Sequence, residues 1–85
     1  MPTISMFYGI VIRMYYDDHK PPHFHAFYNE HSGIFNFEGE QREGNIPKAK
    51  IKLIEAWTII HKEELIANWN LAQNNETLYN INPLN

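Results

Sequence analysis

The stretch ISMFYGIVIRMYY (residues 4–16) decides the first part of the fold. Its β-branched and aromatic residues are typical of strands. Gly9 marks a turn or a bulge between a short strand over about residues 4–8 and a longer one over about 10–16. Alternation along the longer strand places Ile10, Ile12, Met14 and Tyr16 on one face, and Val11, Arg13 and Tyr15 on the other.

More strands are predicted after this stretch. Residues 17–22 form a loop, because two prolines remove backbone donors and hold the chain extended. Residues 23–28 resume as a strand, a hairpin turn covers 29–33, and residues 34–38 form the next strand. Residues 41–45 are predicted to return as a short polar edge strand, where charge deters pairing with another chain.

The second half of the chain has helical periodicity. Pro47 fits the first position of a helix, where its missing N–H costs nothing. An apolar stripe then recurs at helical spacing, formed by Ala49, Leu53, Ala56, Trp57 and Ile60 and widened by Ile54. His61 interrupts the run, and a second stripe follows at Leu65, Ile66, Trp69 and Ala72. Asn74 and Asn75 suit the end of that helix.

These elements predict a single α+β domain over residues 1–85. Its β-rich part covers 1–45 and its helical part covers 46–75, which gives an antiparallel sheet of three to four strands with two helices packed on one face. The tail, residues 76–85, is expected either to add a strand or to dock as an arm on a neighbouring molecule.

Composition limits the classes of function. A chain of 85 residues buries limited surface, and its lack of cysteine excludes disulfides and thiolate chemistry. A net charge of −3 argues against a dedicated nucleic-acid binder, which is usually strongly basic. The first residues lack the pattern of a signal peptide, and no apolar run approaches the roughly 18 residues of a membrane span. We therefore expect a cytoplasmic protein without a membrane partner.

Histidines gather in the segment DDHKPPHFH (residues 17–25), which holds three of the five histidines of the chain. Histidine titrates near neutral pH and is the commonest metal ligand. On a strand, His23 and His25 face the same way and can chelate Zn, Ni or Fe. His19 and Asp17 or Asp18 would complete the ligand set. The alternative interpretation is that these histidines are polar packing groups that fix the Pro-Pro loop or an interface.

The same segment fits acid–base catalysis in a hydrolase or nuclease. His23 or His25 would be the base, and Asp17 or Asp18 the carboxylate that orients it. Without cysteine, the nucleophile would be a hydroxyl group or water, and no recognisable motif surrounds the hydroxyl side chains.

Two further groups are candidates for binding. Basic side chains surround the predicted start of the first helix and would suit an anion such as phosphate: Arg42, Lys48, Lys50 and Lys52. The interpretation that we favour is a solvated face, because Glu43 and Glu55 lie nearby in the sequence. Trp57, Trp69 and Tyr79 are candidate interface residues, although core packing is the competing role for both tryptophans.

Several of these motifs occur in a familiar order: FYGI (residues 7–10), DHKPPHFH (18–25), GNIP (44–47), and the spacing of Trp57, His61 and Trp69. Over about residues 1–84 the chain resembles the small bacterial proteins classed as domain of unknown function 4160. The resemblance implies a compact bacterial or phage protein, encoded beside another small protein in an arrangement like a toxin–antitoxin pair. It implies no catalytic residues.

We therefore expect an interaction module that partners a co-encoded small protein or itself. A metal-dependent hydrolase or nuclease and a nucleic-acid-binding protein are the alternatives.

Overall fold

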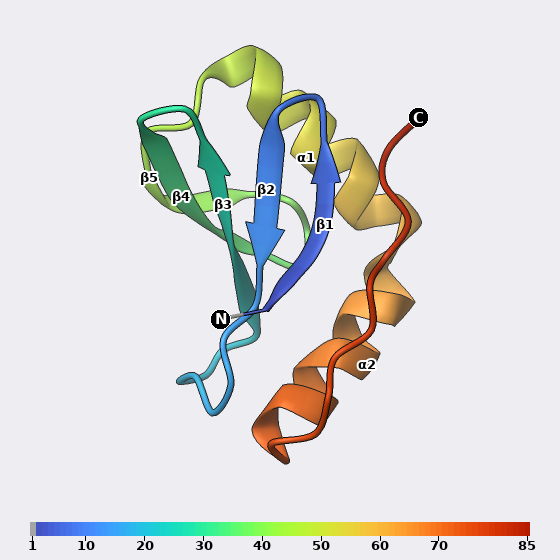
Figure 1. The fold of residues 1–85 in the computed structure, drawn as a ribbon. Coiled ribbons are helices and arrows are strands. Elements are labelled where there is room, and N and C mark those ends of the chain that lie inside the picture. The colour runs from blue at the N-terminus through green and yellow to red at the C-terminus, as the bar shows by residue number, and fades with distance from the viewer. Residues whose placement is uncertain (1) are drawn as a thin grey trace.

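The computed structural model describes residues 2–85 and is built from strands followed by helices (Figure 1). The strands are β1 (Thr3–Phe7), β2 (Ile10–Arg13), β3 (His23–Tyr28), β4 (His31–Asn36) and β5 (Gln41–Gly44). The helices are α1 (Lys48–Ile60) and α2 (Lys62–Gln73). Each strand pairs antiparallel with the next, so the sheet order is β1-β2-β3-β4-β5. No helix within residues 2–85 is long and apolar enough to cross a bilayer.

The α+β class is confirmed, but the sheet has five strands rather than three to four. Tyr8 and Gly9 both have positive φ and form the tight turn between β1 and β2, which suits a two-residue hairpin. The next hairpin is shorter than predicted, because Tyr28 already pairs with His31. Gly33 belongs to β4 rather than to the turn. A Cβ there would lie 2.5 Å from Oε1 of Gln41 and 3.1 Å from side-chain carbons of Ile46 and Phe35, so the glycine leaves room for these three side chains.

The core lies between the helices and one face of the sheet. Phe24 stacks on Phe35 with ring centroids 5.7 Å apart, and Trp57 meets Phe24 edge to face. Trp57 is fully buried and Trp69 is 5% exposed, so both tryptophans pack in the core, the role that competed with an interface. A domain this small needs its largest side chains to fill the space between its two layers.

The tail follows neither alternative predicted for it. Residues 76–85 form no strand, and they run back along the helices of the same chain (Figure 1). Asn68 holds both backbone groups of Tyr79, and the indole N–H of Trp57 donates to the carbonyl of Asn82 at 2.9 Å. The Ile81 N–H donates to the Ile4 carbonyl at 2.7 Å, while the Tyr79 side chain is 71% exposed.

Candidate metal centre

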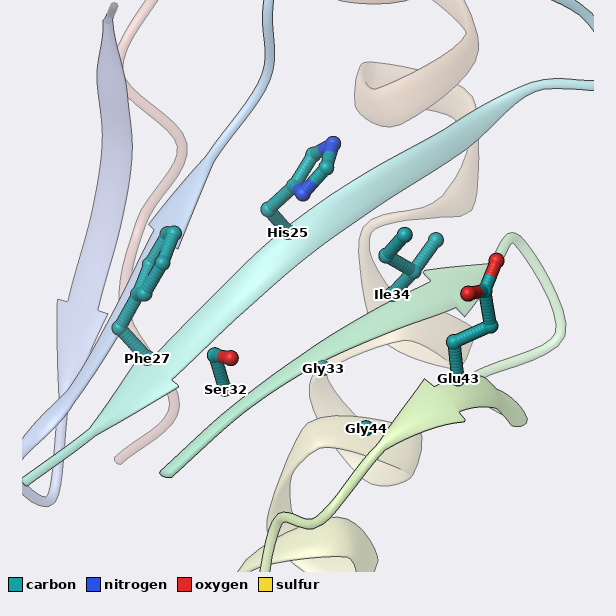
Figure 2. Close-up of a pocket in the computed structure, with 7 residues that line it drawn as sticks. All are labelled: His25, Phe27, Ser32, Gly33, Ile34, Glu43 and Gly44. Atoms are coloured by element: carbon teal, nitrogen blue, oxygen red, sulfur yellow. The ribbon is translucent and has the colours of Figure 1, made fainter. Parts of the chain in front are cut away.

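The histidine segment lies where the 17–22 loop and the start of β3 meet helix α2. His25 pairs across the sheet with Arg13 on β2 and with Ile34 on β4, and Ile34 pairs with Glu43 on β5. Figure 2 shows the side chains of His25, Ile34 and Glu43 on the same side of the sheet. A cavity lies on this side of the sheet, beside His25.

Asp18, His23 and His25 come together at this position. One potential metal-ligating atom from each residue lies within 4.8 Å of the other two. Oδ2 of Asp18 is 2.9 Å from Nε2 of His23 and 3.5 Å from Nε2 of His25. The three side chains are only 17%, 7% and 21% exposed, so the cluster is largely shielded from water.

The ring of His23 is held from two sides. Its Nδ1 lies 2.8 Å from the carbonyl of Pro21, which can only accept, so Nδ1 is the donor. The indole of Trp69 packs beside the His23 ring, with 5.4 Å between the ring centroids. The neighbouring His25 ring is in edge-to-face contact with Tyr15, with 4.4 Å between the centroids. These contacts orient the imidazoles with their Nε2 atoms toward Asp18.

Asp18 is positioned by the end of α2. The Gln73 side-chain amide donates to the Asp18 carbonyl at 2.9 Å, and the Asp17 N–H donates to the Ala72 carbonyl at 3.2 Å. The backbone N–H of His19 donates to Oδ1 of Asp18 at 2.9 Å. Oδ1 is thus engaged with the backbone, and Oδ2 faces the two imidazoles.

The surroundings favour an ionised carboxylate at Asp18 and a neutral imidazole at His25. Burial raises the pKa of Asp18, but the N–H of His19 and the imidazoles of His23 and His25 lower it by more, so the pKa falls below its ordinary value. Burial lowers the pKa of His25 and outweighs the opposing influence of Asp18. These are the protonation states in which Asp and His bind metal ions.

The predicted site residues separate into two groups. His23 and His25 share the cluster, and of the two candidate aspartates Asp18 completes it. The His19 side chain is 81% exposed and lies against the other oxygen of Asp18, at 3.0 Å from Oδ1. Asp17 is exposed and lies outside the group.

The residues that support the cluster were not predicted. Tyr15, Pro21, Trp69 and Gln73 carry no signal for this role in the sequence, because their contacts depend on how α2 packs against the 17–22 loop.

The basic candidates have different surroundings in the structure. The ammonium group of Lys50 lies 4.9 Å above the ring centre of Tyr28, whereas Lys48 and Lys52 are exposed on α1. Arg42 instead lines a groove that reaches His19 and His23. The four basic residues therefore share no single ligand pocket among those found within residues 2–85.

Two cavities flank the cluster. The larger, a groove of about 630 Å³, runs from His19, Pro21 and His23 to Arg42 on β5 and Ile66 on α2. The smaller, of about 290 Å³, lies on the same side of the sheet as the His25 side chain and is lined by His25, Phe27, Ser32, Gly33, Ile34, Glu43 and Gly44 (Figure 2). Ile34 and Glu43 line both cavities, so the two adjoin.

Comparison with known proteins gives one match. The family model described as "Domain of unknown function (DUF4160)" matches residues 9–70 of the 85-residue chain, which includes the whole cluster. No curated protein and no solved structure matches the chain.

Proposed function

The chain belongs to the DUF4160 family, a domain of unknown function, and we propose that it is a metal-dependent hydrolase with a divalent ion bound by Asp18, His23 and His25. The observation that carries the proposal is the convergence of two imidazole nitrogens on one carboxylate oxygen in a shielded site. Two histidines with one carboxylate are a ligand set of catalytic zinc sites and of Fe(II) sites.

The distances suit an ion. A tetrahedral zinc with bonds of about 2.0–2.1 Å has ligand atoms about 3.3 Å apart, because the edge of a tetrahedron is roughly 1.6 times its centre-to-corner distance. The separations from Asp18 Oδ2 to the two Nε2 atoms, 2.9 and 3.5 Å, lie on either side of that value. Small side-chain movements would therefore suffice to ligate zinc.

The hydrogen bonding of His23 also favours a cation. Because Nδ1 donates to Pro21, a neutral ring has its lone pair on Nε2, directed at an acceptor oxygen of Asp18. A proton or a metal ion must lie between these two acceptors. A carbonyl that accepts from the far ring nitrogen, as that of Pro21 does here, is usual for a metal-bound histidine.

The buried Nε2 atom of His25 also supports a bound metal ion. Its Nε2 is buried and has no hydrogen-bond partner among residues 2–85. An unsatisfied buried polar atom costs about 1–3 kcal/mol. A metal ion would satisfy this nitrogen, and it would do so with the neutral ring that the lowered pKa of His25 favours.

The site has the components of hydrolysis. If Asp18, His23 and His25 held a zinc ion, the ion would supply a bound water whose pKa is lowered to about 7. The groove that reaches His23 provides room for a substrate beside the ion. His19, exposed and next to Asp18, is placed at the entrance of that groove.

Zinc binding tests this proposal directly. Protein purified without a histidine tag should contain close to one equivalent of zinc or iron by elemental analysis, or take up zinc at one site in calorimetry. His25→Ala should abolish this uptake, whereas His31→Ala should retain it, because His31 lies on β4 outside the cluster. Equal uptake by wild type and His25→Ala, or none by wild type, would reject the site.

A second candidate function is binding to a small co-encoded protein, as in a toxin–antitoxin-like pair in the bacterial cytoplasm. It is supported by Ile59 and Ile60, which are 65% and 64% exposed at the end of α1. A contiguous exposed apolar patch marks an interaction site, and these two residues would contribute to such a patch. Co-expression with the neighbouring gene product should yield a co-purifying complex that an Ile59→Ser, Ile60→Ser double variant loses. A wild-type chain that elutes alone would count against this role.

A further inference from the structure

We infer that the substrate of this centre is an extended polypeptide that lies across both cavities, with the bond to be cleaved near His23 and His25. This inference rests on the proposed hydrolase function. It concerns which polymer the site accepts, and it is argued from the shape and the charge of the two cavities.

The position of the cavities favours a linear ligand. The groove reaches His23, the smaller cavity reaches His25, and Ile34 and Glu43 belong to both. A chain that passes from one cavity into the other crosses Ile34 and Glu43, with His23 in the wall of the groove and His25 in the wall of the smaller cavity.

The walls of the cavities suit apolar side chains. Phe27 and Ile34 line the smaller cavity, and Phe37 and Ile66 line the groove. Ile66 is 44% exposed, so a bound side chain would remove apolar surface from water. The groove also carries the polar side chains of Asn36, Glu38 and Arg42, which can hydrogen-bond to the backbone of a peptide.

The charges argue against a polynucleotide. Glu43 stands at the junction of the cavities, where a phosphodiester chain would have to cross. Glu38, also in the groove, is paired with Lys62 at 2.7 Å. Among residues 2–85, Arg42 is the one lysine or arginine that lines either cavity. Polynucleotide binding depends on several cationic contacts, and the chain carries a net charge of −3.

The reaction consumes one water per bond cleaved. The water oxygen adds to the peptide carbonyl carbon, the C–N bond breaks, and the protons of the water pass to the leaving amine and the solvent. No oxidant or second substrate is required.

The test compares two fluorescein-labelled probes on the zinc-loaded protein: a neutral 12-residue peptide rich in leucine and serine, and a 12-nucleotide oligouridylate. Fluorescence anisotropy should show binding of the peptide and little binding of the RNA. Mass spectrometry should detect peptide fragments that together weigh one water more than the intact peptide. RNA binding tighter than peptide binding would overturn the inference.

Matched variants separate this inference from the metal site. Ile66→Ser should weaken peptide binding roughly five- to tenfold, because a partly exposed apolar contact is lost. Met6→Ser should not, since Met6 is 64% exposed on β1 outside both cavities. Zinc calorimetry is run on each variant. Zinc uptake without peptide binding rejects the substrate class and leaves the metal site, whereas absence of zinc uptake rejects the proposed function itself.

Discussion

The indole ring of Trp69 packs against the imidazole of His23, with 5.4 Å between the ring centroids and a 55° angle between their planes. This contact links α2, which carries the tryptophan, to the strand that carries the two histidines. The same helix ends at Gln73, whose side chain holds the Asp18 carbonyl. The candidate ligands therefore depend on the packing of α2 as well as on β3.

Trp69 should report ion binding by its fluorescence. Cu²⁺ or Ni²⁺ bound at His23 would lie close enough to quench the indole, so we expect saturable quenching that ends near one equivalent. Trp69→Phe should lose most of this response. Trp57→Phe should keep it, because Trp57 contacts Phe7, Phe24 and His61 rather than the cluster. Quenching that persists in Trp69→Phe would place the ion elsewhere.

Asp18 and Asp17 provide a matched pair of substitutions. Asp18→Asn keeps the shape of the side chain but removes the charged oxygen between the two imidazoles. Zinc affinity should fall by more than the roughly 10–100-fold that loss of an outer-shell partner costs. Asp17→Asn should bind zinc like the wild type, because Asp17 lies outside the cluster and asparagine tolerates its φ of +55°. Calorimetry on both variants checks this, and equal affinities would contradict the assignment of Asp18.

Acid should destabilise the protein when chelator keeps it free of zinc. In the fold the pKa of Asp18 lies below its ordinary value of 3.8. The ionised carboxylate therefore adds to the free energy of unfolding above about pH 3.8, and this addition is lost as the pH falls further. The pKa of His25 lies below 6.5, so the folded state resists its protonation and stability declines as pH falls through that value. Protonation of Asp18 and protonation of His25 therefore both destabilise the folded protein as the pH falls.

Urea unfolding between pH 7.5 and pH 3 measures this dependence. The midpoint should decrease with acidification, and the decrease at the acid end should be smaller in Asp18→Asn, which has no carboxyl group to titrate at this position. A midpoint that rises on acidification would contradict the assigned directions of both shifts.

The alternation of the strands was predictable because it depends on local sequence. Ile10, Ile12 and Met14 are all fully buried, as their two-residue spacing predicts. The shared face of His23 and His25 follows from the same rule. The choice of Asp18 over Asp17 does not, since it depends on a backbone turn with positive φ at Asp17 and on contacts with α2.

The buried face of α1 was predicted less well. Ile60 was placed in the apolar stripe but is 64% exposed, whereas Thr58 is fully buried. The hydroxyl of Thr58 donates to the Ile54 carbonyl at 2.7 Å, so the helix satisfies its polar group and the residue can pack inside. Hydrophobic periodicity counts threonine as polar and cannot anticipate this bond.

The docked tail should contribute measurable stability through Asn68. This side chain is 1% exposed, its amide donates to the Tyr79 carbonyl at 2.9 Å, and its carbonyl accepts from the Tyr79 N–H at 3.0 Å. Asn68→Ala leaves both backbone groups of Tyr79 without these partners, so we expect a loss of about 1–3 kcal/mol in the free energy of unfolding. Asn70→Ala, exposed on the same helix, should change stability by only a few tenths of a kcal/mol. Chemical denaturation of the two variants measures this difference, and equal stabilities would show that the tail is not held by Asn68.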